Sequence, residues 1–188
     1  PTDKGGQLFN PPEKLQKLCL PLTPIGYNDL FCLSPPQVHT LSIGASKPED
    51  FDLHLDAIEI QNNTKDILAP IEKRLKKEMA SVMGQEWTNH WQEGLPSILD
   101  IGSPFPLYQI LRLYTLAKAY DMLDYGKYRY NLLNNGSDWF PGNKIDDGDF
   151  SKIKHALPSY RFIEQLASIL AETHQLFNES DSKRLSES

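Results

Sequence analysis

A short turn near residue 45 has the residue types that hold a phosphate group. Gly44, Ala45, Ser46 and Lys47 follow one another there, and proline and glutamate come next. Serine followed three residues later by glutamate, with a proline in the first turn, predicts a helix that starts at Ser46. The first N–H groups of a helix are unpaired and lie at the positive end of its dipole, so they attract phosphate. Gly44 would let the backbone approach a ligand, Ser46 would offer a hydroxyl and Lys47 a charge. The alternative is that Ser46 only caps the helix and Lys47 is only solvated.

The other reactive side chains show no pattern of a metal site or of a nucleophile. The chain has five histidines, and no pair of them has the His-x-x-His or His-x-x-x-His spacing of metal ligands. Cys19 and Cys32 lie in apolar segments, which predicts two buried free thiols. Four aromatic residues could line a substrate mouth, although packing is the more common role of such residues: Trp87, Trp91, Trp139 and Phe140. We therefore expect no metal site.

One strand and several helices would position the turn. The β-branched residues of segment 38–43, between Pro-Pro and Gly44, predict a strand. The helix after the turn has apolar positions 51, 55 and 58 on one face, with 53 and 57 beside them. A single strand cannot pair its own edges, so its neighbours would have to come from elsewhere. Apolar spacing and breakers predict further helices over residues 13–20, 66–91, 107–123 and 159–177, and exposed loops over residues 98–105 and 143–154.

Composition limits the class of protein. The net charge of −6 and the pI near 5.3 argue against a partner with a phosphate backbone, so we expect no nucleic acid. No apolar run reaches the ~20 residues of a membrane span, and no signal peptide opens the chain. We expect a cytoplasmic protein that does not enter a membrane. The chain starts with a polar, glycine-rich stretch and no initiator methionine, which leads us to expect a fragment of a longer protein.

Two parts of the chain together resemble a known enzyme family. Residues 30–51 are similar to the last βα unit of bacterial aldo/keto reductases, in which a strand ends in Gly-Ala-Ser and a Lys/Arg-Pro-Glu sequence opens the next helix. Residues 87–97 and 110–142 resemble the helical extension of a subfamily of predicted aldo/keto oxidoreductases. The likeness covers nearly the whole chain, to about residue 177, and it is most specific over residues 110–142.

The resemblance implies a fold and a division of the chain. The fold would be mostly α, with the C-terminal βα portion of a (β/α)8 TIM barrel followed by an all-helical extension. Residues 1–63 would be the barrel portion, 64–177 the helical extension and 178–188 a flexible tail. The partner would be the N-terminal barrel portion of the same protein.

The resemblance also implies an activity that this chain cannot perform alone. The family transfers a hydride between a nicotinamide cofactor, usually NADPH, and a small carbonyl substrate. Its tyrosine, lysine, aspartate and histidine come from earlier barrel strands, so no residue is assigned a catalytic role here. Gly44, Ala45, Ser46 and Lys47 would contact the adenosine part of the cofactor.

Two positions of the implied cofactor site depart from the family. Asp50 stands where many relatives have arginine or glutamine, and His54 stands where asparagine is common. An aspartate at this place would repel a 2′-phosphate, which leaves NADP and NAD both open as the cofactor.

An iron–sulfur cluster is a second type of cofactor, and protein interaction is a second class of function, that the sequence brings into question. Some relatives have a ferredoxin-like tail, but the corresponding segments here contain no cysteine, and iron–sulfur clusters need thiolates. We expect no iron–sulfur cluster. The alternative function is a free-standing helical interaction module without catalytic activity. The amphipathic helices favour that function, whereas the predicted strand and its capped turn favour the reductase.

Overall fold

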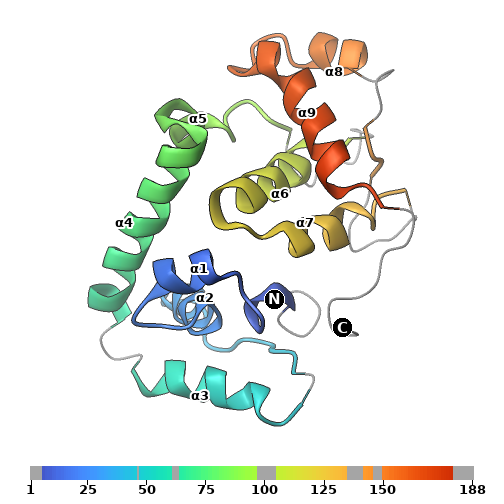
Figure 1. The fold of residues 1–188 in the computed structure, drawn as a ribbon. Helices are drawn as coiled ribbons and strands as arrows, with labels where there is room; N and C mark the ends of the chain where they lie inside the picture. Colours follow the sequence, from blue (N-terminus) through green and yellow to red (C-terminus); the bar gives the residue numbers. More distant parts are fainter. Residues whose placement is uncertain are drawn as a thin grey trace.

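The protein is mostly α-helical. The computed structural model describes residues 6–45, 47–60, 64–96, 105–134, 142–145 and 150–179, and within these ranges no strand is formed. The elements run from the N-terminal helices through one long helix to a C-terminal group (Figure 1). In chain order they are η1 (Gly6–Leu8), α1 (Glu13–Cys19), α2 (Pro24–Leu33), α3 (Asp50–Glu59), α4 (Thr64–Met83), α5 (Gln85–His90), α6 (Leu107–Tyr120), α7 (Leu123–Tyr130), α8 (Phe150–Ala156) and α9 (Ile163–Phe177).

The long helix α4 connects the N-terminal helices to the rest of the molecule. It lies along one side of the molecule, with α1 and α2 near its first half and α5 at its end (Figure 1). Its buried residues Leu68 and Ile71 join one continuous hydrophobic core with residues of α1, α2 and α6. The Arg74 guanidinium donates hydrogen bonds to the backbone carbonyls of Leu18, at 2.9 Å, and Leu20. Since the last carbonyls of a helix lack partners within it, Arg74 fixes the end of α1 to α4.

Helices α6, α7 and α9 form the C-terminal part of the core. Asp121 has the left-handed backbone conformation (φ 60°), which ends α6 and lets α7 begin at Leu123. Gly126 of α7 lies directly against the ring of Phe177, which is completely buried at the end of α9. On the solvent side, Glu172 of α9 accepts hydrogen bonds from Tyr114 (2.7 Å) and Lys118 (2.9 Å) of α6.

One asparagine links the ends of α7 and α9. The Asn131 Nδ2 group donates to the carbonyls of Lys127 (2.8 Å) and Phe177 (2.7 Å). Its Oδ1 accepts hydrogen bonds from Lys144 Nζ (2.7 Å) and from the backbone N–H of Glu179 (3.1 Å). Asn131 is buried, so these bonds satisfy a polar group that would otherwise be costly to bury.

The predicted strand over residues 38–43 was wrong for this chain. The segment has no regular secondary structure, and the side chains of residues 39, 40, 42 and 43 are exposed. The physical reason is that a strand requires a neighbour, and no other strand exists among the described residues. The described residues before residue 64 therefore form helices and this irregular segment, and the expected βα unit is not formed among them.

Several predicted element bounds were also wrong. The helix predicted over residues 66–91 is divided at Gly84, whose φ of 87° is incompatible with helix. The segment predicted as a loop over residues 143–154 contains the start of α8 at Phe150. The helix predicted from residue 159 begins at Ile163.

Candidate functional site

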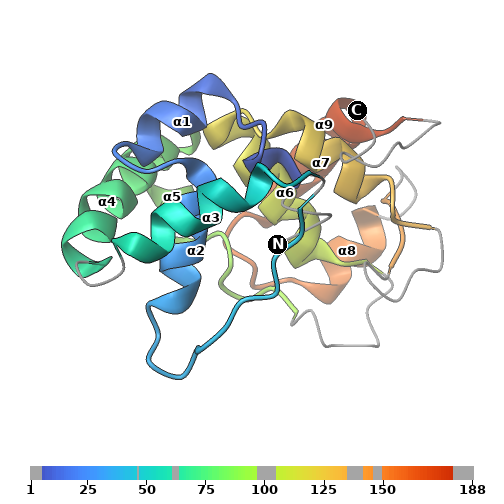
Figure 2. The same cartoon turned by 90° about the horizontal axis from the view of Figure 1, so that it is seen from below.

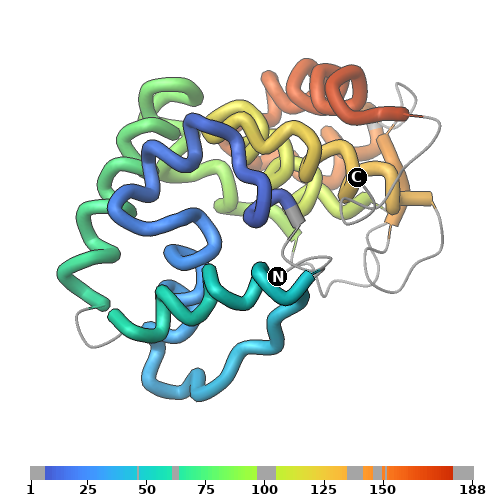
Figure 3. Tube along the Cα trace, turned by 60° about the horizontal axis from the view of Figure 1, so that its bottom comes forward, coloured from blue at the N-terminus to red at the C-terminus, as the bar shows by residue number. Residues whose placement is uncertain are grey.

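The residues predicted to hold a cofactor lie on and before helix α3. This helix packs mainly on α2, and the two lie next to each other at one end of the molecule (Figures 2 and 3). The face of α3 toward α2 consists of Asp50, His54 and Ala57, all of which are buried. Their spacing of four and three residues places them in one row on the helix. Two of the predicted site residues thus lie in a buried interface between two helices.

A buried histidine–aspartate pair joins α3 to α2. The Nδ1 atom of His54 makes a hydrogen bond with the Oδ2 atom of Asp29 on α2, and both side chains are 7 % exposed. A carboxylate can only accept a hydrogen bond, so Nδ1 carries the proton and the tautomer of the imidazole is fixed. The ring of Phe9 lies edge-on to the imidazole, with ring centroids 5.7 Å apart. The pair therefore holds a defined histidine orientation inside an apolar surrounding.

The other nitrogen of His54 has no partner in the described part of the chain. Its Nε2 atom is buried and makes no hydrogen bond. Burying such a group without a partner costs roughly 1–3 kcal/mol. An imidazole oriented by a carboxylate can act as a general base or bind a ligand atom through Nε2. Among the described residues, no hydroxyl or thiol makes a hydrogen bond with Nε2.

The turn before α3 is already hydrogen-bonded within the chain. The backbone N–H of Lys47 donates to Asp50 Oδ2 at 3.2 Å. The N–H groups of Asp50, Phe51 and Asp52 bond to the carbonyls three residues earlier, at 3.1–3.2 Å, and α3 begins at Asp50 instead of Ser46. A phosphate group at this turn would have to replace the carboxylate of Asp50 and some of these carbonyls.

The remaining predicted site residues lie before this turn. Gly44 and Ala45 are half-buried in the irregular segment that leads to α3, whereas the Lys47 side chain is exposed. Ser46 itself lies outside the described residues, but α3 has Glu49 at its N-cap position, so the predicted helix start at Ser46 was wrong. The structure thus brings Asp50 and His54 onto one helix face and places Lys47 at its start.

Asp29 is the site residue that the sequence reasoning missed. It contacts His54 across 25 residues of sequence, a separation that no local pattern reveals. The available signal was a single carboxylate in the otherwise apolar segment 25–33, which forms the buried helix α2. A buried carboxylate requires a partner, and His54 supplies it.

The exposed side of α3 carries an apolar stripe beside the carboxylates of Asp52, Asp56 and Glu59. Phe51, Leu55 and Ile58 are 48 %, 55 % and 48 % exposed, whereas Asp50 and His54 are 6 % and 5 % exposed. Helices of globular proteins normally bury the apolar stripe and expose the polar residues. In the described part of the chain, six of the exposed large apolar side chains fall between residues 31 and 60: Phe31, Ile43, Phe51, Leu55, Ile58 and Ile60.

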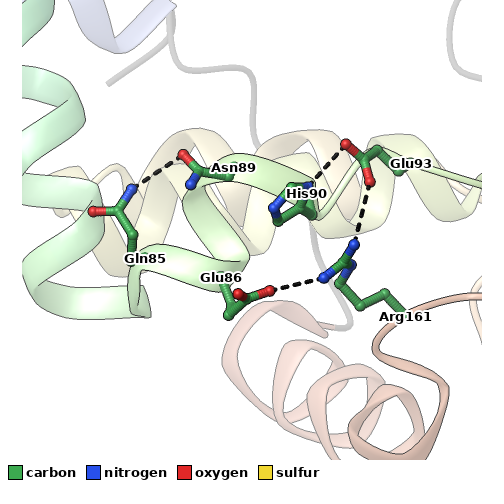
Figure 4. Close-up of polar contacts among 6 residues, drawn as sticks. All are labelled: Gln85, Glu86, Asn89, His90, Glu93 and Arg161. Atoms are coloured by element: carbon green, nitrogen blue, oxygen red, sulfur yellow. Dashed lines mark hydrogen bonds and ion pairs between the residues drawn. The ribbon is translucent and has the colours of Figure 1, made fainter.

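Polar residues of α5 interact at the surface with Glu93 and Arg161 (Figure 4). Arg161 reaches from the turn before α9 to Glu86, at 3.0 Å, and its other terminal nitrogen is 4.0 Å from Glu93. His90 bonds to Glu93 at 2.9 Å, and this hydrogen bond lowers the pKa of Glu93. Glu86, Glu93 and Arg161 are all at least half exposed, so the pairs stabilise the position of α5 only slightly.

Trp87 and Trp91, considered above for a substrate mouth, are core residues. They are 4 % and 5 % exposed and stack on each other with ring centroids 6.3 Å apart. Trp87 Nε1 donates to the buried hydroxyl of Thr115 at 3.0 Å, and the Tyr160 hydroxyl donates to the carbonyl of Trp91 at 2.8 Å. Their polar atoms are thereby used in packing α5 against α6 and the C-terminal helices. Trp139 and Phe140 lie outside the described residues.

Within the described ranges, no group of three or more histidine, cysteine, aspartate or glutamate side chains is arranged to hold a metal ion. No helix within the same ranges has the length and apolar character needed to cross a membrane. Neither a protein-family model, nor a curated protein, nor a solved structure matches this chain.

Proposed function

We propose that this chain is the C-terminal portion of an NAD(P)H-dependent aldo/keto reductase, which reduces a carbonyl compound by hydride transfer. The chain would supply cofactor contacts and a helical cap, and it would be inactive alone because the resemblance places the reacting residues on earlier barrel strands. Its partner would be the N-terminal barrel portion of the same protein, and its site of action the cytoplasm.

The exposed apolar stripe of α3 is the observation that carries this proposal. In a (β/α)8 barrel the outer helices pack an apolar stripe onto the parallel strands. Phe51, Leu55 and Ile58 form such a stripe and are half exposed here. The segment over residues 38–43 also has a β-branched composition and no partner strand. Both features are explained if barrel strands cover this side of the chain, and neither is needed in a free-standing helical bundle.

The proposed cofactor contacts lie on α3 and in the turn before it. The proposed contacts are made by Gly44, Ala45, Ser46 and Lys47, with Asp50 and His54 one and two turns further along. The unpartnered Nε2 atom of His54 could accept a hydrogen bond from a ligand. The carboxylate of Asp50 lies at the first turn of α3 and would repel a 2′-phosphate. We therefore propose that NADH binds at least as well as NADPH.

Calorimetric titration of both cofactors tests the proposal. NADPH and NADH would be titrated separately into this chain and into a protein extended upstream through the proposed barrel. We expect binding only by the extended protein, and an Asp50→Asn variant should bind NADPH more tightly. Binding by neither protein would refute the proposal and favour the helical interaction module, which the wholly helical described structure also allows.

A stability comparison tests the covering of α3 without a cofactor. Leu55→Gln removes an apolar side chain that is 55 % exposed, and Val82→Gln on α4 is a matched control that is 41 % exposed. Full burial of such a side chain contributes about 1.5–3 kcal/mol, so covering the exposed half contributes about 1 kcal/mol. We expect the cost of Leu55→Gln to rise by about 1 kcal/mol in the extended protein, while the cost of Val82→Gln stays constant. Equal costs in both proteins would show that no strand covers α3.

A further inference from the structure

A cavity lies where the N-terminal helices meet α4, α6 and α7. It has a volume of about 270 Å³ and is lined mainly by apolar side chains, among them Leu15, Leu75, Leu116 and Met122. These residues come from α1, α4, α6 and the junction of α6 with α7. The volume is just below the ~300–1,000 Å³ of typical small-molecule sites, so the cavity can hold a compact ligand.

Arg112 is the charged residue of this cavity. It lies on the same face of α6 as Leu116 and Tyr120, at spacings of four residues, and it is half-buried. Among the described residues that line the cavity it is the only cation, and no carboxylate of the described chain forms an ion pair with it. A guanidinium that is partly removed from water without a partner is unfavourable, whereas a carboxylate satisfies it with two parallel hydrogen bonds.

Most other polar groups of the wall are already paired. Gln7 Oε1 accepts the backbone N–H of Tyr125 at 3.0 Å, and the Tyr120 hydroxyl donates to the carbonyl of Leu75 at 3.1 Å. The Tyr27 hydroxyl has no hydrogen-bond partner among the described residues. Burial, with a smaller contribution from nearby acidic groups, raises its pKa to about 12, so it stays a neutral donor. The wall therefore offers an anion the Arg112 guanidinium and the Tyr27 hydroxyl, in a largely apolar surrounding.

We propose that this cavity binds a small molecule that has one carboxylate on an apolar body. The carboxylate pairs with Arg112, and the body lies against the leucines and Met122. A single cation matches a single negative charge, which favours a carboxylate over a phosphate dianion. This proposal does not rest on the proposed reductase function, because the cavity lies between helices of the chain itself.

Octanoate and octan-1-ol are suitable probes because they share an apolar chain and differ in charge. Binding would be followed by the NMR signals of the methionine methyl groups, since Met122 lines the cavity and Met83 does not. We expect octanoate to shift the Met122 signal and to bind at least tenfold more tightly than octan-1-ol. Octanoate that binds no more tightly than octan-1-ol, or that leaves the Met122 signal unchanged, would overturn the proposal.

Substitution of Arg112 tests whether its charge causes the preference for octanoate over octan-1-ol. Arg112→Gln should remove the preference for octanoate over octan-1-ol, and Arg112→Lys should retain part of it. Arg161→Gln is the matched control, because Arg161 pairs with Glu86 at the surface and does not line the cavity. An unchanged octanoate affinity in a folded Arg112→Gln variant would refute the assignment. If that variant does not fold, the comparison of the two probes on the natural chain still decides the proposal.

Discussion

Substitution of Gly126 by alanine tests the closest approach between two helices of the core. A methyl group on Gly126 would lie 2.5 Å from Cε1 and 2.6 Å from Cζ of Phe177. Ordinary contacts between carbon atoms are about 3.5–4.0 Å, so this methyl group would overlap the ring by about 1 Å. The ring cannot turn toward solvent, because Phe177 is 0 % exposed.

The expected loss of stability follows from two opposing effects. Overpacking of a rigid core costs about 1–3 kcal/mol, and this contact belongs at the upper end because the ring is enclosed. Alanine favours the helix over glycine by about 1 kcal/mol. We therefore expect Gly126→Ala to lower the free energy of unfolding by about 2 kcal/mol.

Urea unfolding followed by tryptophan fluorescence measures this loss. A double-mutant cycle with Phe177→Leu provides the control, since leucine lacks the ring atoms that the new methyl group meets. We expect Gly126→Ala to cost at least 1 kcal/mol less in the Phe177→Leu background than alone. A Gly126→Ala variant as stable as the natural chain would refute the close packing of α7 on α9.

Three further predictions concern single polar contacts. Thr115→Val should cost about 1–3 kcal/mol in unfolding by urea, because it leaves the buried indole N–H of Trp87 without an acceptor, whereas Thr115→Ser should cost less. Asp29→Asn should speed hydrogen exchange of the α3 amides and leave those of α6 unchanged, because it weakens the hydrogen bond between residue 29 and His54. Equal changes in both helices would contradict this contact. Hydrogen bonds from Lys118 and Tyr114 of α6 hold the pKa of Glu172 below its ordinary value of 4.5. The stability that these bonds provide is therefore present above pH 4.5, and it is lost as the pH falls through the lower pKa of the folded protein. The unfolding free energy of Glu172→Gln should accordingly fall less on acidification than that of the natural chain, as thermal unfolding at pH 3–6 would show.

Helices with regular apolar spacing were predicted well from the sequence. Residues 107–120 form α6 as expected, because Pro106 favours a helix start and the leucines recur on one face. The end of α6 at Asp121 was not predicted, since a left-handed aspartate follows from the packing of α7 against α6 and not from a local pattern. Gly84 interrupts a run of apolar spacing that the periodicity alone extends to Trp91.

The candidate site was predictable only in part. The turn and the resemblance predict Lys47, Asp50 and His54 as cofactor-binding residues. The structure places all three at the start of α3 or on its buried face, and their binding role stays a prediction. The sequence does not predict Asp29 as part of this site, because its contact with His54 depends on how α2 and α3 pack. A β-branched segment predicts a strand only if a neighbour exists to pair with it, and that information lies outside residues 38–43.

The hydrogen bonds at Asn131 also determine how the molecule would carry a mechanical load. Its side chain bonds both to the carbonyl of Phe177 and to the N–H of Glu179, one on each side of the end of α9. A pulling force applied to the chain after Glu179 would therefore act on the hydrogen bonds between α7 and the end of α9 before it could separate α9 from α6.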